Sequence, residues 1–211
     1  MKKAKKIKRG RFIVLDGPDG AGKTTHTKFV AAELQSRGLK VRSLREPGGT
    51  ALGELVRGLL LNHSKTKIDT LAETFLFQAA RAQLLHEVIE PALEKGEWVV
   101  LDRHTLSTLV YQGYAGGIRK KTVKALSQAA VGDLKPDAYI VLWVPPGIGA
   151  ERRSGRAVDR MESKGDEYLE RVFRGFQKEA KRHARKYTLI DGRGAIQDVR
   201  GTIWQEIEPL L

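Results

Sequence analysis

Residues 12–25 read FIVLDGPDGAGKTT and decide the fold of this 211-residue chain. Residues 12–16 form a short apolar run with the length and β-branched content of a buried strand. Residues 17–24 fit the pattern G-x-x-x-x-G-K-[ST], and helical spacing of apolar residues follows directly. A strand, a glycine-rich turn and a helix in this order predict a phosphate cradle, because backbone N–H groups and the helix N-terminus converge on one point.

Each part of this loop has a predicted role. Its glycines let the backbone wrap closely around a phosphate. Lys23 is expected to reach the β- and γ-phosphates of a nucleotide, and the Thr24 hydroxyl to ligate Mg²⁺. The predicted ATP-binding residues of this segment are Gly17, Pro18, Asp19, Gly20, Ala21, Gly22, Lys23, Thr24 and Thr25. The motif predicts nucleotide binding but does not name a reaction.

Strand and helix patterns alternate along the rest of the chain. Strands are predicted at residues 12–16, 40–44, 98–102, 139–144 and 187–190. Helices are predicted at residues 23–37, 51–61, 69–94, 121–131, 166–185 and 195–210. Alternation of this kind predicts a three-layer α/β fold, a parallel five-stranded sheet covered by helices on both faces. We expect one domain over residues 11–211.

Composition narrows the class of protein. Hydrophobic residues make up 41% and charged residues 30%, as in a soluble globular protein, and the lack of cysteine excludes disulfides. Seven of the basic residues stand within the first eleven positions, so removing them from the net charge of +13 leaves +6. Residues 1–10 are interpreted as a disordered basic tail, with nucleic-acid contact or an organelle address as alternatives. No signal peptide or membrane span is apparent, which predicts a cytoplasmic protein.

Polar residues follow two further strands. Asp102 ends the strand at 98–102, where a carboxylate typically helps to hold Mg²⁺, although a structural role is the alternative. Arg103 and Arg45 are candidate phosphate ligands, because a guanidinium matches phosphate oxygens. Phe77 and Arg81 lie four residues apart on one helix face, suited to stacking and reading a base. In isolation such a pair is more often core packing plus a surface charge.

Residues 151–164 are polar, basic and without clean periodicity. We interpret them as a mobile lid flanked by short helical turns, since a small kinase must exclude water from its phosphates. The segment carries Arg152, Arg153, Arg156 and Arg160, which could stabilise a transferring phosphoryl group. A solvated basic loop is the alternative. A GTPase is disfavoured because no N-K-x-D motif is present, and the D-G-R-G at 191–194 lies at the wrong end of the chain.

The motifs taken together resemble the thymidylate kinase family over residues 11–210. The segments that carry the resemblance, beside FIVLDGPDGAGKTT, are REPGGT, FLFQAARAQL, VVLDRHTLSTLVYQG, GDLKPD and DRMES. The resemblance implies transfer of the ATP γ-phosphoryl group to dTMP, with Mg²⁺ as the metal and a homodimer as the assembly. A small P-loop kinase for another nucleotide or nucleoside is one alternative. A nucleotide-dependent nucleic-acid-binding protein is another.

The resemblance also implies residue roles. It assigns the acceptor nucleotide to Asp19, Arg45, Phe77, Arg81, Arg103, Ser107, Thr108, Tyr111 and Gln112. Asp19 would contact the sugar, Phe77 would stack on thymine and Arg81 would bond its O4. Tyr111 would crowd the 2′ position. The implied metal residues are Thr24 and Asp102, and the implied catalytic residues are Lys23, Asp19, Arg45, Arg103, Arg153 and Arg156.

Two positions refine this assignment. Gly20 stands where some members of the family have an arginine inside the phosphate loop. The chain therefore resembles the bacterial-type enzymes, which supply catalytic arginines from the lid. Arg152 would lie near adenine, and Arg153 and Arg156 near the ATP phosphates.

Overall fold

A parallel sheet forms the centre of the molecule. The computed structural model describes residues 9–63, 66–155 and 159–211. The strands within them are β1 (Phe12–Asp16), β2 (Val41–Arg45), β3 (Trp98–Asp102), β4 (Ala138–Trp143) and β5 (Thr188–Asp191). All pair in parallel in the order β2-β3-β1-β4-β5. The predicted α/β class and five-stranded parallel sheet are confirmed.

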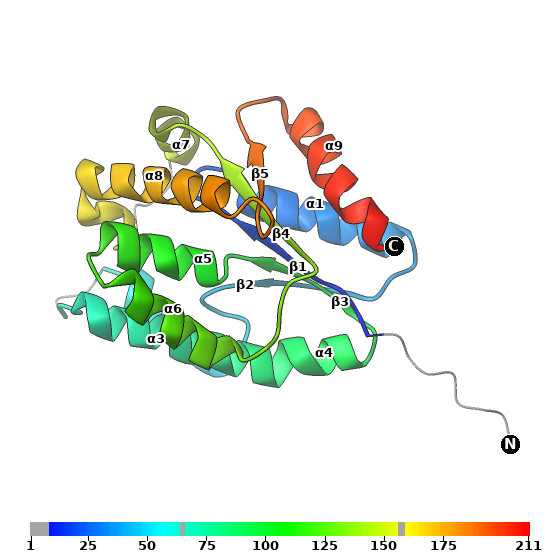
Figure 1. Ribbon diagram of the computed structural model, residues 1–211, viewed down its shortest axis with the longest axis horizontal. Coiled ribbons are helices and arrows are strands. Elements are labelled where there is room, and N and C mark those ends of the chain that lie inside the picture. Colours follow the sequence, from blue (N-terminus) through cyan, green and yellow to red (C-terminus); the bar gives the residue numbers. More distant parts are fainter. Residues whose placement is uncertain (1–8, 64–65, 156–158) are drawn as a thin grey trace, which may run out of the picture.

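Helices cover both faces of this sheet (Figure 1). One face is covered by α1 (Lys23–Ser36) and α9 (Ile196–Ile207). The other is covered by α3 (Thr70–Leu84), α4 (Glu90–Glu94), α5 (Thr105–Thr108), α6 (Lys120–Val131) and α8 (Asp166–Arg182). Helix α2 (Ala51–Leu61) packs against α3, and a 3₁₀ turn, η4 (Glu208–Leu210), follows α9.

Two hydrophobic clusters lie on the two sides of the sheet. Phe12 and Val14 belong to the cluster beneath α3 and α8, whereas Ile13 and Leu15 pack against α1 and α9. All four side chains are fully buried. Successive residues of a strand point to opposite faces, so a strand covered on both faces reads as a continuous apolar run. The apolar run at 12–16 therefore anchors both halves of the core.

Three segments differ from the prediction. The helix expected at 69–94 is interrupted by a π-helical turn, η1 (Leu85–Ile89). Residues 105–115 were not predicted to be helical, yet they form α5 and a second π-helical turn, η2 (Leu109–Ala115). The expected loop from 151 is helical at its start, because α7 (Pro146–Arg153) begins with a proline that favours the first helical position. A 3₁₀ turn, η3 (Glu162–Lys164), follows in the same segment.

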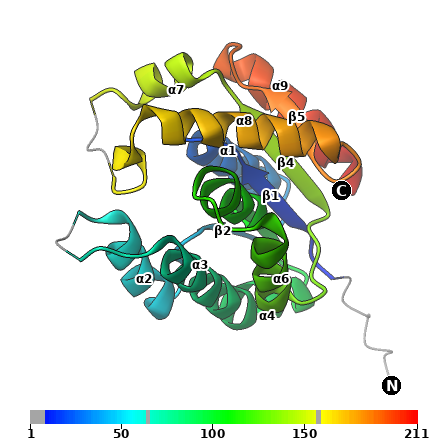
Figure 2. The same cartoon turned by 60° about the vertical axis from the view of Figure 1, so that its left-hand side comes forward.

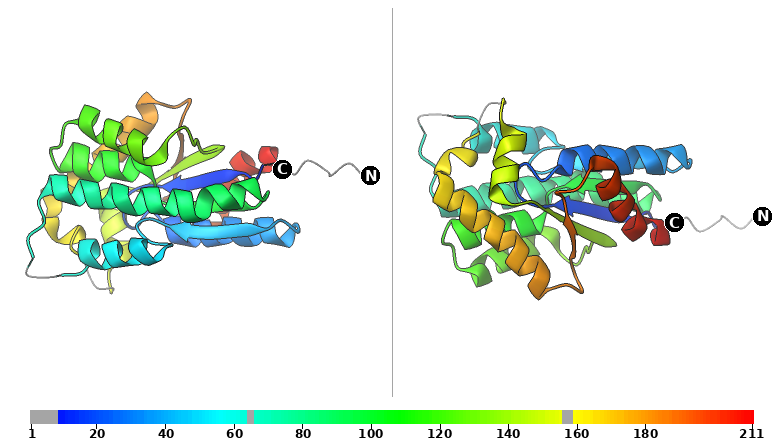
Figure 3. Two further views of the ribbon diagram at one scale, coloured as in Figure 1. Left: turned by 90° about the horizontal axis from the view of Figure 1, so that it is seen from below. Right: turned by 90° about the horizontal axis from the view of Figure 1, so that it is seen from above.

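The carboxyl ends of the strands meet at one edge of the sheet. The strand order changes direction at β1: strands β3 and β2 lie on one side of it, and β4 and β5 on the other. Ligands of open parallel sheets bind beside such a reversal. Figure 2 shows α7 and η3 on one side of this edge and α2 on the other, and Figure 3 places the C-terminus at the opposite end of the molecule. No helix among the described residues has the length and apolar character needed to cross a membrane.

Candidate active site

The loop between β1 and α1 has the conformation of a phosphate cradle. Gly17 and Gly20 have φ angles of 142° and 82°, in a region that favours glycine. A Cβ atom at Gly17 would lie 2.1 Å from the carbonyl oxygen of Leu142, and one at Gly20 would lie 2.3 Å from that of Gly149. Only glycine therefore fits at these two positions, where the loop passes close to β4 and α7.

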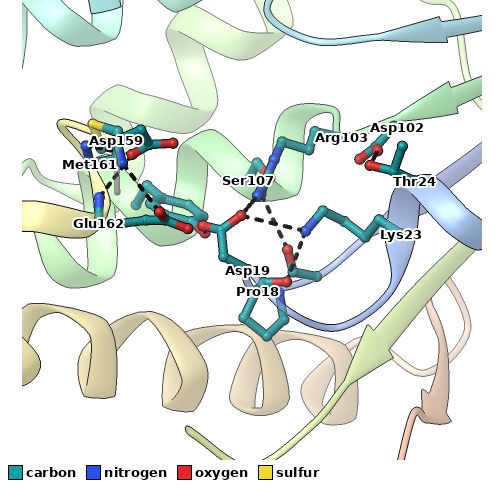
Figure 4. A network of polar contacts seen from close by, with 12 residues as sticks. Pro18, Asp19, Lys23, Thr24, Asp102, Arg103, Ser107, Asp159, Met161 and Glu162 are labelled. Atoms are coloured by element: carbon teal, nitrogen blue, oxygen red, sulfur yellow. Dashed lines mark hydrogen bonds and ion pairs between the residues drawn. The ribbon is translucent and has the colours of Figure 1, made fainter. Parts of the chain in front are cut away.

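The predicted metal residues are in contact. The Thr24 hydroxyl donates a hydrogen bond of 2.7 Å to Oδ2 of Asp102 (Figure 4). Mg²⁺ prefers a few carboxylate and hydroxyl oxygens combined with substrate phosphates, and this pair supplies such donors at the cradle. Among the described residues no group of three or more His, Cys, Asp or Glu side chains is placed to hold a metal alone. The pair therefore fits a magnesium ion that arrives with a nucleotide.

Lys23 lies inside the loop. Its Nζ donates a hydrogen bond of 2.8 Å to the Pro18 carbonyl and lies 3.9 Å from Oδ1 of Asp19. Burial and the nearby Arg103 guanidinium lower the pKa of Lys23 to about 8. An anionic ligand would offset both effects, because it would stabilise the protonated amine.

Asp19 joins the loop to the segment after β3. Its carboxylate pairs with the Arg103 guanidinium through Oδ1 and accepts a hydrogen bond of 2.5 Å from the Tyr111 hydroxyl through Oδ2. Burial alone would raise the pKa of Asp19, but Arg103, Lys23 and Tyr111 outweigh it and hold that pKa well below its usual range. Burial raises the pKa of Tyr111, so its hydroxyl remains a donor. Three predicted site residues thus converge.

The segment after β3 is locked to the loop. Arg103 has a positive φ of 71°, the one such value among the described non-glycine residues. In this conformation its guanidinium donates hydrogen bonds to the Gly17 carbonyl and the Ser107 hydroxyl, at 3.2 and 3.1 Å. Asp16 is fully buried and accepts hydrogen bonds from Ser107, from the His104 backbone and from Tyr139. These bonds compensate the strain that a non-glycine residue bears in this conformation.

A single large cleft, about 740 Å³ in volume, unites these groups. Predicted residues that line it are Asp19, Gly20, Gly22, Lys23, Thr24, Thr25, Arg45, Phe77, Arg81, Asp102, Arg103, Ser107, Thr108, Tyr111, Gln112, Arg152 and Arg153. Gly17, Pro18 and Ala21 shape the loop without lining the cleft. The structure therefore brings together predicted residues from β1 to α7.

At one end of the cleft Arg81 lies beside the half-buried Phe77. The Arg81 side chain is 2% exposed, and its Nε and Nη2 contact Oε2 of Glu46 at 2.7 and 2.6 Å. Its Nη1 donates to Gln78 and Thr108. Burial would raise the pKa of Glu46, but Arg81 and His104 outweigh it and lower that pKa. Glu46, for which the motifs indicated no role, thus holds the predicted base-reading arginine in place.

Arginines gather at the acceptor side of the phosphate loop. Arg45 is largely exposed and pairs with Glu54 at 3.3 Å, and Arg57 donates to the Pro47 carbonyl at 3.0 Å. Burial and the charges of Arg45 and Arg103 lower the pKa of Arg57. Such crowding of guanidinium groups suits a dianion. Arg57 lies on the helix predicted at 51–61, but nothing in its local pattern indicated a ligand.

The predicted lid arginines separate into two groups. Arg153 donates from Nη1 to the backbone oxygen of Asp19 at 3.2 Å, and Arg152 lines the cleft while remaining exposed. Arg156 lies outside the described residues. Arg160 does not approach the phosphate loop as expected. It binds the Leu60 carbonyl and the fully buried Glu73 instead, because that carboxylate offers a charged partner on α3.

The cleft is also lined by residues that the motifs did not indicate. Gly192, Gly194, Ile196 and Val199 line the cleft beside His26. The D-G-R-G segment, which is misplaced for a GTPase, thus lines the same cleft as the phosphate loop. The topology places it there, because β5 ends at the same sheet edge as β1 and Gly192 donates to the Trp143 carbonyl at 2.8 Å.

Comparison with known proteins identifies the family of this chain. The sequence profile described as Thymidylate kinase matches residues 15–203. This chain belongs to the thymidylate kinase family. A thymidylate kinase of Pseudomonas syringae pv. tomato is 40% identical over 96% of this chain and 97% of its own length. Thymidylate kinases of Methylobacillus flagellatus and Afipia carboxidovorans are 42% and 39% identical, over 91% and 96% of this chain. The resemblance inferred from the motifs is confirmed, and with it a phosphotransferase of the thymidylate kinase family.

Proposed function

We propose that this chain transfers the γ-phosphoryl group of ATP to dTMP, giving dTDP for dTTP synthesis. The observation that carries the proposal is the convergence of Asp19, Arg103 and Tyr111 between the phosphate loop and the acceptor segment. In this proposal the Asp19 carboxylate would bind the sugar and the Arg103 guanidinium the acceptor phosphate, and their contact beside loop 17–24 supports it. Membership of the thymidylate kinase family favours this function over the nucleic-acid-binding alternative.

On the donor side, ATP would lie with its phosphates in loop 17–24. Lys23 would exchange the Pro18 carbonyl for phosphate oxygens, and Arg152 would lie toward the adenine. Thr24 and Asp102 would hold Mg²⁺. The ion would neutralise phosphate charge when bound. The residues of the loop position the donor for attack along the axis of the bond that breaks.

On the acceptor side, the phosphate of dTMP would lie among Arg45, Arg57 and Arg103. Thymine would stack on Phe77, with its O4 on Arg81. Ser107, Thr108 and Gln112, which line the same cleft, would complete the pocket around the base. Tyr111, fixed on Asp19, would leave no room for a 2′-hydroxyl and so favour deoxyribose.

The transfer itself needs no strong base, because the acceptor phosphate is ionised at neutral pH. Arg153, already on the Asp19 backbone, would neutralise charge that develops on the equatorial oxygens. Arg156 is proposed for the same role. We propose residues 151–164 as the lid of a single catalytic domain over 11–211, preceded by the basic tail, of which residues 1–8 lie outside the described part.

Turnover with a panel of acceptors tests the proposal. With MgATP we expect dTMP to be phosphorylated with a higher kcat/KM than dUMP, dCMP, AMP or deoxynucleosides. Removing Mg²⁺ with a chelator should abolish turnover. Preference for another acceptor would point to a different P-loop kinase and contradict the proposal.

We also propose a homodimer that packs through α2 and α3. Exposed apolar side chains line these neighbouring helices: Leu52, Leu55, Leu59, Leu71 and Phe75. The spacing of three to four residues puts those of each helix on one face, and an apolar stripe of this kind marks an interface. Sedimentation should report a dimer that Phe75→Glu dissociates. Leu211→Glu, at an equally exposed leucine near the C-terminus, should not dissociate it.

A further inference from the structure

Glu73, near the start of α3, is a buried hub that the proposed transfer does not use. Its carboxylate is completely buried. Nε2 of Gln112 donates to it at 3.0 Å, Nη2 of Arg160 at 2.5 Å, and Nζ of Lys164 contacts both of its oxygens at 3.0 Å. One partner belongs to the acceptor pocket and two belong to the proposed lid. Glu73 therefore connects the two regions directly.

The Glu73 carboxylate determines the orientation of the Gln112 side-chain amide. A carboxylate paired with two cations only accepts hydrogen bonds, so the amide must present its NH₂ group to Glu73. Oε1 of Gln112 is then the atom left for the cleft. Within residues 9–63, 66–155 and 159–211, no donor forms a hydrogen bond with that oxygen. The amide nitrogen is thereby committed to the protein, and the amide oxygen stays available to a ligand.

The same logic applies to the other base-reading residue. Arg81 carries only donors and is held from behind by Glu46. The pocket thus offers the one remaining N–H of Arg81 and an acceptor from Gln112. Thymine and uracil carry a carbonyl at position 4 and an N–H at position 3, which match this arrangement. Cytosine carries an amino group and an unprotonated nitrogen there and would meet like groups at both points.

We propose that Glu73 is a positioning residue that turns the Gln112 amide toward an N3–H donor and thereby selects thymine or uracil against cytosine. The inference rests on the proposed function and concerns the same site. Arg160 and Lys164 stabilise the arrangement because they compensate the buried charge of Glu73. Arg160 also binds the Leu60 and Leu61 carbonyls at 2.7 and 3.0 Å, which fixes this part of the lid against the end of α2.

The ratio of kcat/KM for dTMP to that for dCMP tests the role of Glu73. Glu73→Gln replaces an acceptor with a group that can also donate, which frees the Gln112 amide to turn over. We expect the ratio to fall roughly tenfold, the effect of one hydrogen bond to a charged partner. The ratio for dTMP over dUMP should stay unchanged, because both bases present the same edge. Glu73→Asp, which still only accepts, should keep more of the discrimination.

Glu179 supplies a matched control. It is also a buried carboxylate with basic neighbours, Lys124 at 3.1 Å and His183 at 3.4 Å, but it lies outside the cleft. Glu179→Gln should lower thermal stability without changing the dTMP to dCMP ratio. Lys164→Met removes one cation from Glu73 at a partly exposed side chain and should lower the ratio two- to threefold. This variant tests the inference if Glu73→Gln folds poorly.

A double substitution separates positioning from general damage. In a Gln112→Leu background, Glu73→Gln should have no further effect on the ratio, because no amide remains to be oriented. If Glu73→Gln and Lys164→Met both slow dTMP and dCMP turnover by equal factors, Glu73 is only structural and the inference fails. Absence of dTMP turnover by the unsubstituted chain would count against the proposed function instead. Calorimetric binding of dTMP and dCMP to the same variants would then still decide the role of Glu73.

Discussion

Arg81 and Arg45 both face the proposed acceptor, but their surroundings predict different costs of removal. Arg81 is 2% exposed and contacts the buried Glu46 twice, whereas the Arg45 side chain is 57% exposed and contacts an exposed Glu54. Replacing Arg81 with methionine keeps the volume but leaves Glu46 without its main partner. Breaking one side of a buried ion pair typically costs about 3–5 kcal/mol. For Arg45→Met the expected cost is at most about 1 kcal/mol.

Thermal unfolding followed by circular dichroism measures this difference. At about 2–4 °C per kcal/mol for a chain of this size, Arg81→Met should lower the Tm by about 6–20 °C. Arg45→Met should lower it by less than about 4 °C. Both variants should raise the KM for dTMP, because both remove an acceptor contact. The pair thus separates a residue needed for structure and binding from one needed for binding alone.

The pH dependence identifies Glu46 as the cause. In the unsubstituted chain the lowered pKa of Glu46 contributes stability that is present above its unfolded value and lost as the pH falls through the folded value. Without Arg81 only His104 opposes the effect of burial, which raises that pKa, so Arg81→Met should lose stability as the pH rises above the ordinary pKa of a glutamate. Glu46→Gln added to Arg81→Met should remove this slope. A Tm within 3 °C of the unsubstituted chain at every pH would refute the reasoning.

Further predictions concern the donor side, the base and the lid. Lys23→Ala should abolish turnover with the fold intact, and near-normal activity would contradict the cradle assignment. In the unsubstituted chain, kcat/KM for ATP should decline as the pH rises above about 8, where Lys23 loses its proton. Phe77→Ala should raise the KM for dTMP far more than that for ATP, and an equal rise would contradict stacking. Arg153→Ala combined with Arg156→Ala should mainly lower kcat, and an unchanged kcat would remove the lid from the mechanism.

Residues whose partners are close in sequence could be predicted. The strand, loop and first helix within 12–36 depend on apolar periodicity and on glycine, both of which are local. Asp102 could be predicted because a strand end at the same sheet edge brings it to Thr24. The order of strands and helices was therefore enough to predict that Thr24 and Asp102 meet at one edge of the sheet.

Residues that act through distant partners could not be predicted in this way. Glu46 contacts a residue 35 positions away, and Glu73 contacts one 87 positions away. Neither has a motif of its own, so only the folded chain pairs each with its cation. The same limit explains why Arg160 was wrongly predicted to lie near the phosphates. It stands among other arginines of the predicted lid, and its partner Glu73 is distant in sequence. The left-handed turn at Arg103 is likewise set by tertiary contacts, since arginine has no intrinsic preference for it.

The distribution of these partners divides the cleft into a buried part and an exposed part. Arg81 and Gln112, at the proposed base site, are almost completely buried, and each contacts a buried carboxylate. Arg45 and Arg152, at the proposed phosphate sites, are exposed, and Arg45 pairs with the exposed Glu54. Selection of a base depends on donors and acceptors that cannot rearrange, because an adaptable pocket would satisfy the wrong base as well. The cleft thus combines buried, hydrogen-bonded groups at the proposed base with exposed arginines at the proposed phosphates.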